Sequence, residues 1–272
     1  MGGGESATIQ PTMPESITLR HDLDSLWVSL LAEASYCEQK AALSCVYPEA
    51  EPESEAMQAG TAAHSVLEAE TEKIEREELE RRMAAGEALC LREFPLRAEL
   101  SGVLLRGHLD QVEIEGQRAL WLYDFKFSRY FDRLFPNHRL QLSLYGLLLA
   151  ASGFDVSELI CAVIIVPPRR GGQGSLIETN PALANTAIAM SKQLRDQRGR
   201  LRRGGQLLEP GFAVHAFKFS ERLARRDFEE AIGYWIGART ARAADSAAKC
   251  RSCAFNAQGL CSVALAPPGL RR

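Results

Sequence analysis

The stretch Leu105-Arg106-Gly107-His108-Leu109-Asp110 decides the fold of this chain, together with Tyr123-Asp124-Phe125-Lys126 shortly after it. Around both stretches apolar residues recur mostly at every second position, as in strands that bury one face. The apolar positions are Val103, Leu105, Leu109, Val112 and Ile114 in the first segment and Ala119, Trp121, Tyr123, Phe125 and Phe127 in the second. Both segments are therefore predicted to be extended, and their short separation predicts a hairpin.

The turn of this hairpin is expected to be a three-residue loop, 116–118, which begins with glycine and places Glu115 opposite Ala119. Continued along the strands, this register sets Asp110 opposite Asp124. Opposed residues of an antiparallel pair point to the same face, so both carboxylates are expected on one surface.

Lys126 shares that surface, because side chains two apart on a strand point to the same side. Two carboxylates and a lysine can hold a divalent cation against a phosphodiester, and Mg²⁺ and Mn²⁺ prefer carboxylate, carbonyl and water oxygens. Asp110 and Asp124 are the expected metal ligands, with the backbone carbonyl of Phe125 as a third. Lys126 would lower the pKa of the attacking water or stabilise the charge on the phosphate. The pattern predicts a nuclease.

Three residues outside the hairpin complete the predicted site. His64, on a charged helix expected over residues 58–87, would add an imidazole ligand, which suits Mn²⁺ better than Mg²⁺. Gln141 and Tyr145 lie one turn apart on a later apolar helix, where an amide and a phenol can orient the nucleophile or contact DNA. Alone, each feature has an ordinary explanation, such as a surface hairpin or the polar fringe of a packed helix. Their order along the chain is far more specific than any single member.

The C-terminal region carries a compact cysteine trio, Cys250, Cys253 and Cys261. Two cysteines separated by two residues can wrap one metal centre, so the trio predicts a structural metal site that lacks one ligand. Cys37, at an expected helix break, is the preferred fourth ligand, and Cys45 is the reserve. Cys90 and Cys161 have strand-like apolar surroundings and are interpreted as core residues. The spacing is compatible with Zn²⁺ and with an iron–sulfur cluster, and unrelated buried cysteines are the alternative.

The chain is expected to form one domain. Residues 1–20, rich in Gly, Ser, Thr and Pro, are interpreted as a flexible leader, and residues 21–272 as a single domain. This domain divides into N-terminal helices (21–88), a core (89–219) and a C-terminal helix with the cysteine tail (220–272). Further strands are expected over 89–99, 158–166 and 211–219, and further helices over 140–151, 181–203 and 221–247. The apolar helix between two buried strands makes a crossover, so the fold class is α/β.

Composition narrows the class of protein. The chain has 272 residues, with 32 Lys and Arg against 35 Asp and Glu and a formal charge of −3, so contact with nucleic acid must come from local basic patches. No apolar run approaches the roughly 20 residues that span a bilayer, and the start lacks the regions of a signal peptide. A cytoplasmic location without membrane contact is expected, where the seven cysteines stay reduced.

Two basic segments are candidates for DNA contact. The first directly follows Lys126 and adds aromatic residues for base stacking. Its members are Arg129, Tyr130, Phe131, Arg133, His138 and Arg139. The second lies on the helix expected over 181–203 and carries Lys192, Arg195, Arg198, Arg200, Arg202 and Arg203. A solvated helix face explains the second slightly better, so the first is the preferred contact.

The whole series resembles the RecB-like branch of the PD-(D/E)XK nuclease superfamily, and in particular its CRISPR-associated exonuclease family, Cas-four. The resemblance runs from Val28 to Cys261. The matching positions are Ser29, Tyr36 and Cys37 of the opening helix, the motif histidine His64, the acidic Asp110, Asp124 and Lys126 of Asp/Glu-x-Lys, Gln141 and Tyr145 of Gln-x-x-x-Tyr, and the terminal trio Cys250, Cys253 and Cys261. In one departure, Glu38, Gln39 and Lys40 follow the first cysteine, where many relatives have Pro and Arg.

The resemblance implies a restriction-endonuclease-like fold, a mixed sheet flanked by helices with a helical N-terminal part and a C-terminal cysteine-ligated cluster region. It implies a four-iron four-sulfur (4Fe-4S) cluster on Cys37, Cys250, Cys253 and Cys261, with zinc as the alternative, and a core that cuts DNA with Mn²⁺ or Mg²⁺. The expected function is a DNA exonuclease acting on single strands or ends, which processes prespacers in CRISPR adaptation beside the spacer integrase complex, with oligomers allowed. The alternatives are a stand-alone recombination or repair nuclease and a metal-stapled DNA-binding module without cleavage.

Overall fold

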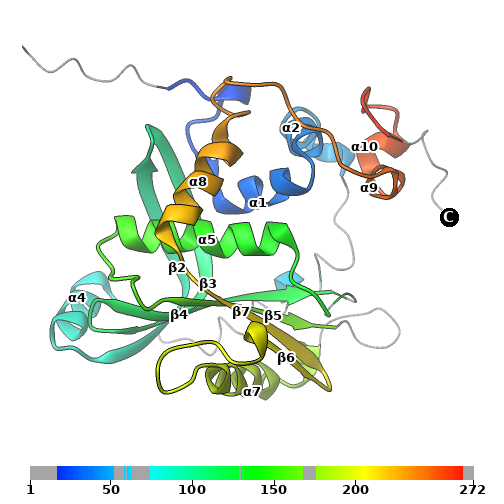
Figure 1. Ribbon diagram of the computed structural model, residues 1–272. Helices are drawn as coiled ribbons and strands as arrows, with labels where there is room; N and C mark the ends of the chain where they lie inside the picture. Colours follow the sequence, from blue (N-terminus) through cyan, green and yellow to red (C-terminus); the bar gives the residue numbers. More distant parts are fainter. Residues whose placement is uncertain are drawn as a thin grey trace, which may run out of the picture.

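A seven-stranded mixed sheet forms the centre of the computed structural model, which describes residues 17–51, 58, 60–62, 74–128, 130, 132–167 and 176–265. The strands follow the order β1-β3-β4-β5-β7-β6, and β2 pairs with β3. They are β1 (Leu26–Trp27), β2 (Ala88–Leu100), β3 (Val103–Glu115), β4 (Arg118–Phe127), β5 (Ile160–Val166), β6 (Gln206–Glu209) and β7 (Phe212–Lys218). The predicted α/β class, with a mixed sheet between helices, is confirmed (Figure 1).

Helices cover both faces of this sheet (Figure 1). On one face lie α1 (Val28–Tyr36), α5 (Pro136–Ala151) and α8 (Glu221–Ile232), and on the other lies α7 (Ala182–Ser191). The remaining described helices are α2 (Glu38–Val46), α4 (Arg76–Ala84), α6 (Leu176–Thr179), α9 (Ala247–Arg251) and α10 (Ala254–Ala257). The break between α1 and α2 falls at Cys37, as predicted, because Cys37 is extended with φ −166° and ψ 107°.

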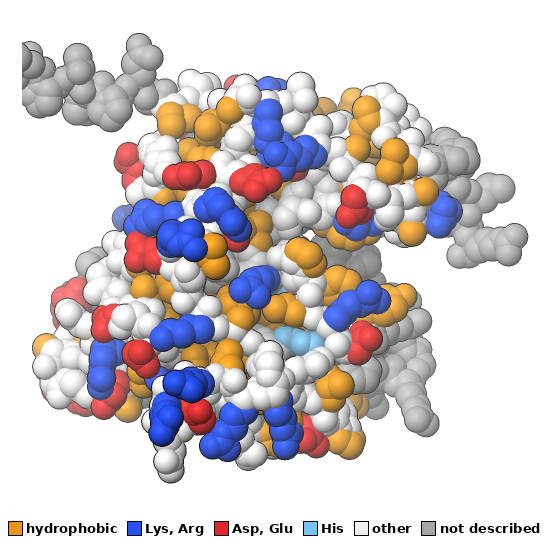
Figure 2. Space-filling view, viewed as in Figure 1, with side chains coloured by type: hydrophobic (Ala, Val, Ile, Leu, Met, Phe, Trp, Pro, Cys, Tyr) orange, Lys and Arg blue, Asp and Glu red, His pale blue; other side chains and the backbone are white. Residues whose placement is uncertain are grey.

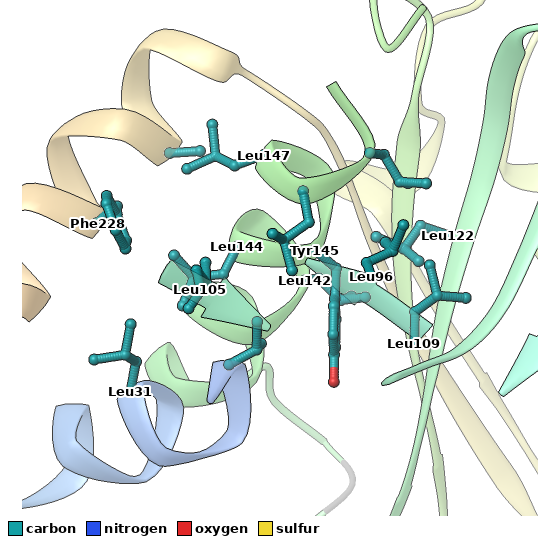
Figure 3. Close-up of a cluster of buried hydrophobic side chains, with 14 of the residues drawn as sticks. Leu31, Leu96, Leu105, Leu109, Leu122, Leu142, Leu144, Tyr145, Leu147 and Phe228 are labelled. Atoms are coloured by element: carbon teal, nitrogen blue, oxygen red, sulfur yellow. The ribbon is translucent and has the colours of Figure 1, made fainter. Parts of the chain in front are cut away.

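The α5 helix lies at the centre of the larger hydrophobic core. Its residues 142–149 are all buried, which is the pattern of a helix covered on every side. Below it, Leu105, Leu109 and Leu122 of the sheet belong to the same core, and α1 and α8 close it from above. Figure 3 shows Tyr145 among these leucines, with its ring directed from α5 toward the strands and its hydroxyl at the far end. The core therefore fixes where α5 presents its polar residues.

The hairpin of β3 and β4 has a different turn from the predicted one. Glu115 pairs with Arg118, so the loop has two residues and the predicted pairing of Glu115 with Ala119 is wrong. Farther along, a β-bulge adds one residue on β4, and beyond it Gln111 pairs with Tyr123. The bulge compensates for the shorter loop. The register continued from that pair sets the two aspartates of the predicted site opposite each other.

The crossover from β4 to β5 through α5 is present as predicted, because these two strands run parallel. Every residue of β5 is buried, since helices cover both of its faces. β7 lies antiparallel beside β5, and β6, which the sequence analysis missed, pairs with β7 at the edge of the sheet.

Three predicted helices are too long. The helix over 58–87 is wrong as one element, because Glu75 is extended with ψ 154° and α4 begins after it. The helix over 181–203 ends at Ser191 and is followed by the 3₁₀ turn η3 (Lys192–Leu194) and a loop. The helix over 221–247 ends at Ile232, beyond which the chain turns and buries Trp235 completely. Short helices α9 and α10 replace the irregular tail expected after Cys250.

The packed chain begins inside the expected leader. Leu19 is 6% exposed, and the N–H of Arg20 donates to the carbonyl of Trp235 at 2.8 Å. Residues 1–16 lie outside the described residues. Within the described ranges, every helix is too short or too polar to cross a membrane.

Candidate active site

The edge of β3 changes partner in the middle of the strand. β2 runs along one edge, and the other edge pairs first with β1, at Leu105 and Arg106, and later with β4, from Gln111 onward. Between these contacts, residues 107–110 have no described strand beside them on that edge. We call this segment the edge gap. Its backbone polar groups need other partners, because buried unpaired ones are costly.

Two side chains make hydrogen bonds to backbone groups at this gap. The Tyr145 hydroxyl of α5 donates to the His108 carbonyl oxygen at 2.6 Å. The Phe125 N–H of β4 donates to Asp110 Oδ2 at 2.7 Å. The first bond satisfies a backbone carbonyl of the gap, and in the second the Asp110 side chain accepts from a β4 N–H that has no strand partner on β3 there. The edge gap therefore holds Tyr145 and Asp110 in fixed positions near each other.

Gly107 lets the tyrosine approach the strand. A Cβ at this position would lie 2.7 Å from Tyr145 Cε1 and 3.2 Å from Val28 Cβ, closer than packed side chains allow. The glycine of Gly-His-Leu-Asp is thus required by the position of the ring. The sequence analysis missed this role, although a glycine inside a strand is a known sign of close approach by another group.

Asp124 and Lys126 lie on the same face of β4, as predicted. Asp124 is 1% exposed, and Lys126 Nζ donates to its Oδ1 at 2.9 Å. The other oxygen, Oδ2, has no hydrogen-bond partner among the described residues. A buried carboxylate oxygen is costly unless a cation or a donor meets it.

The local charges keep the lysine and the tyrosine protonated. Burial alone would lower the pKa of Lys126, but the carboxylates of Asp124 and Asp110 more than offset it, so the pKa is raised. Burial raises the pKa of Tyr145, and the same two carboxylates raise it further. Lys126 is therefore a fixed positive charge, and the Tyr145 hydroxyl is a fixed donor.

The two carboxylates fit a divalent cation. The unpartnered Oδ2 of Asp124 is the group that such an ion would neutralise. Among the described residues, no group of three or more His, Cys, Asp or Glu is arranged to hold a metal. His64, the third side chain expected there, lies outside the described residues. Two carboxylates and the Phe125 carbonyl suit Mg²⁺ or Mn²⁺, which retain several waters.

Polar residues of α5 line up toward this centre. Gln141 interacts with the Tyr145 hydroxyl. His138 lies on the same helix face, one turn before Gln141, and its Nδ1 is buried with no partner in the described structure. The pKa of His138 is lowered to about 4, by burial first and then by the charges of Lys126 and His215, and the charge of Asp124 acts against them. The imidazole is therefore neutral near pH 7.

Two residues near the centre were missed entirely. His215 of β7, 6% exposed, pairs with Val163 of β5, which pairs with Asp124, so the two polar residues stand in one row across the sheet. Glu93 of β2 has a left-handed φ of 44° at the position across from Asp110. Its charge contributes to the raised pKa of Tyr145. Both positions depend on pairing between distant segments, which local patterns do not reveal.

The sequence profile of the PD-(D/E)XK nuclease superfamily matches residues 29–258. The chain belongs to the PD-(D/E)XK nuclease superfamily. The solved structure titled "Crystal structure of SSO0001" is similar to it with a TM-score of 0.48 and 15% identity, over 89% of this chain and 88% of that chain. No curated protein matches the chain. Membership makes the protein a nuclease of a generally metal-dependent class, which uses ions such as Mg²⁺ or Mn²⁺ and acts on DNA.

The preferred DNA-contact segment of this PD-(D/E)XK nuclease is partly described. Tyr130 is 64% exposed, and Arg133 is exposed beside Phe135. Arg139 stacks on Phe217 at 4.4 Å from the ring centre. Arg129 and Phe131 lie outside the described residues.

Four cysteines of the nuclease line one cavity of ≈ 240 Å³ between α2 and the C-terminal helices. They are the predicted set, Cys37, Cys250, Cys253 and Cys261. Burial raises the pKa of Cys37, and the Leu265 N–H donates to Cys250 Sγ at 3.3 Å. Cys45, the reserve ligand, packs against the main core instead. The four thiols thus converge on one space without forming a metal cage in the described structure.

The other cysteines of the nuclease differ from each other. Cys161 is buried, as expected of a core residue. Cys90 is exposed, so its assignment to the core is wrong. It lies on β2, whose residues alternate between the core and solvent in this part, and its neighbours Leu89 and Leu91 take the buried positions.

Glu38, at the departure from the family pattern, has a structural role in this nuclease. Its buried carboxylate forms an ion pair with Arg239 and accepts the Arg242 N–H at 2.8 Å. Lys40 forms ion pairs with Glu33 and Glu51, both at 2.6 Å. Glu38 thus connects the start of α2, next to the first cysteine, to the segment that leads to the other three.

Proposed function

We propose that this nuclease is a metal-dependent DNA exonuclease acting on single-stranded DNA or on DNA ends. The edge gap supports this most, because it gathers two carboxylates, a lysine and a tyrosine from three elements. A hairpin with a purely structural role gains nothing from burying Asp124 with one oxygen unpartnered. Such a cost is typical of residues that act on a ligand.

The proposed ligands of Mn²⁺ or Mg²⁺ are Asp110, Asp124, the Phe125 carbonyl and His64. When bound, the ion supplies an activated water and neutralises charge on the phosphate. Lys126, fixed 2.9 Å from Asp124, places a positive charge beside the scissile phosphate and stabilises the transition state. Gln141 and Tyr145 orient the nucleophile or the DNA from α5.

Asp124→Ala tests the proposed site. Cleavage of single-stranded DNA with Mn²⁺ should fall at least about 100-fold, as expected when a group that stabilises the transition state is lost. Asp227→Ala, which breaks an exposed pair with Arg226 on α8, is the matched control and should cleave normally. Unchanged cleavage by Asp124→Ala would disprove the site. DNA binding without any cleavage by the natural protein would favour the non-catalytic binding module.

The cysteine cavity is proposed to hold a 4Fe-4S cluster, with zinc as the alternative. Support comes from the four thiols that line one space, and the choice of iron over zinc rests on the resemblance to Cas-four. Anaerobic absorption spectra with iron and sulfide analysis test it. A colourless protein loaded with zinc would remove the cluster and leave the nuclease proposal standing.

The proposed context is prespacer processing in CRISPR adaptation, with residues 21–272 as one RecB-like domain. Its support is the ordered series from Cys37 to Cys261 that the chain shares with Cas-four. A stand-alone recombination or repair nuclease is the alternative. Co-purification with a spacer integrase would favour the first, and co-purification with a helicase or annealing protein would favour the second.

A further inference from the structure

Four arginines gather on one loop at the edge of the sheet. The loop spans residues 195–205, between η3 and β6, and ends in the 3₁₀ turn η4 (Arg203–Gly205); we call it the arginine loop. The four exposed residues are Arg198, Arg200, Arg202 and Arg203. They do not lie on a helix face as expected, since α7 ends at Ser191. Figure 2 shows Lys and Arg side chains gathered on the lower front of the molecule, where Figure 1 places this loop.

The backbone of the arginine loop is held in place. Asp196 Oδ1 accepts the N–H groups of Arg198 and Arg200, both at 2.8 Å. The Arg202 N–H donates to the Leu194 carbonyl at 2.7 Å. Gly205 lies so close to β7 that a Cβ there would be 2.0 Å from the Ala216 oxygen. The side chains therefore extend from a fixed base, which lowers the entropy lost when they bind a ligand.

The charge of the arginine loop is largely uncompensated. Within the described residues, none of the four guanidiniums forms an ion pair, whereas Arg195 on the same loop pairs with Glu158 at 2.7 Å. Two carboxylates lie at this loop in the described structure: the charge of Asp196 acts on Arg200 and Arg202, and Glu158, the partner of Arg195, lies beside Gly199. The four guanidiniums thus outnumber these two carboxylates, on a chain whose formal charge is −3. Such a patch favours a polyanion.

One row of paired strand residues leads from the end of the loop toward the candidate active site. Gln206, the first residue of β6, pairs with His215, which stands in the row that ends at Asp124. Neighbouring strands are about 4.8 Å apart, so β6 lies about 14 Å from β4. The Gln206 side chain also donates to the Asp132 carbonyl at 2.9 Å, which fastens the segment after Lys126 to this edge.

We propose that the arginine loop binds the phosphate backbone of the DNA strand whose end is processed at Asp124. This inference rests on the proposed function and adds the path of the strand away from the cut. Guanidinium groups bind phosphate oxygens with two hydrogen bonds each, and such contacts position a strand without reading its sequence. They also release counterions, so they make affinity depend on salt.

Binding of fluorescent single-stranded DNA in EDTA, followed by anisotropy over a series of KCl concentrations, tests the loop without cleavage. The loop variant carries Arg198→Gln, Arg200→Gln and Arg203→Gln. Its affinity should fall at least about 10-fold, and the slope of log K against log salt should shrink by about two, at about 0.7 per lost contact. The control carries Arg222→Gln, Arg225→Gln and Arg226→Gln on α8, an equal change of charge, and should bind within about twofold of the natural protein.

Unchanged binding by the loop variant, or equal weakening of both variants, would overturn the proposal. If the loop variant unfolds at a lower temperature, the same three positions changed to Lys keep the charge and should keep the salt slope. Cleavage with Mn²⁺ is measured separately. If the natural protein binds DNA through the loop but does not cut it, the proposed nuclease site is contradicted and the proposal for the arginine loop stands.

Discussion

Tyr145 depends on a residue that has no side chain. Its ring occupies the space that a side chain at Gly107 would take, and its hydroxyl donates a hydrogen bond to the carbonyl oxygen of the next residue, His108. One position on β3 thus decides whether α5 can place a phenol at the edge gap. The hydrophobic pattern does not reveal this role, because the pattern is defined by apolar side chains and glycine has none.

Gly107→Ala should destabilise the protein and displace the tyrosine. The new Cβ would meet Tyr145 Cε1 at 2.7 Å, and overpacking of this kind costs about 1–3 kcal/mol. Urea unfolding measures the loss. Gly153→Ala, at a glycine with no atom within 4 Å of the added Cβ but a φ of 91°, separates backbone strain from packing. An unchanged midpoint for Gly107→Ala would contradict the close approach.

His138 should make stability depend on pH. Its pKa is about 4 when folded, because of burial first, and 6.5 in an ordinary environment, so the unfolded chain takes up the proton first as the pH falls. The contribution is complete above pH 6.5 and is lost as the pH falls to about 4. The difference in unfolding free energy between the natural protein and His138→Gln should therefore change across this window. A constant difference would show that the imidazole is not buried.

At the scale of elements, the segment after α8 is held by one partly buried ion pair. Arg239 binds Glu38 of α2, and the Gln39 N–H donates to the Arg242 carbonyl at 3.2 Å. This contact brings the C-terminal cysteines next to Cys37. It joins residues about two hundred positions apart, which explains why periodicity along the chain did not reveal it.

Glu38→Gln should cost about 1–3 kcal/mol, because the buried carboxylate that accepts from Arg239 and from the Arg242 N–H is lost, while the guanidinium stays partly in water and keeps its bond to the Glu230 carbonyl. Denaturant unfolding gives the value. Limited proteolysis should then cut residues 236–246 faster, since the pair no longer holds them. Glu221→Gln, which breaks the exposed pair with Arg225, is the control and should change stability by less than about 1 kcal/mol. Equal effects of both changes would contradict a special role for Glu38.

Elements defined by local pattern were largely predictable from sequence. The extended hairpin, the apolar α5 and the break at Cys37 each follow from residues close together in the chain. The ends of α7 and α8 were not, because their polar continuations keep helical composition while tertiary contacts such as the burial of Trp235 end the helix. The pairing of β1 and the row from Asp124 to His215 depend on long-range contacts that no short pattern encodes.

At the scale of the molecule, the two ends of the described fold meet at the cysteine cavity. A metal bound there would bridge Cys37 and Cys250, and would stabilise the folded state by its own binding energy. The candidate active site lies on separate elements, β3, β4 and α5. We therefore expect that the metal at the cysteines can be removed or replaced independently of the ions at the candidate active site.

Removal of the cysteine-bound metal with a strong chelator should lower the thermal unfolding midpoint and speed proteolysis within residues 236–265. Single-stranded DNA cleavage should return when Mn²⁺ is added back only if the core has stayed folded. Cys37→Ser should reproduce the effect, and Cys45→Ser, outside the cavity, should not. If neither the chelator nor Cys37→Ser changes the thermal unfolding midpoint, the proposal of a stabilising metal is contradicted.

The edge gap has a consequence for the newly made chain. The gap is bounded by β1 on one side and β4 on the other, so one of its limits is absent until Leu26 has docked beside Leu105. In a folding intermediate that has not completed this step, the edge gap that holds Tyr145 is not yet formed. We expect such an intermediate not to cleave nucleic acid, so that nuclease activity appears only when folding is complete.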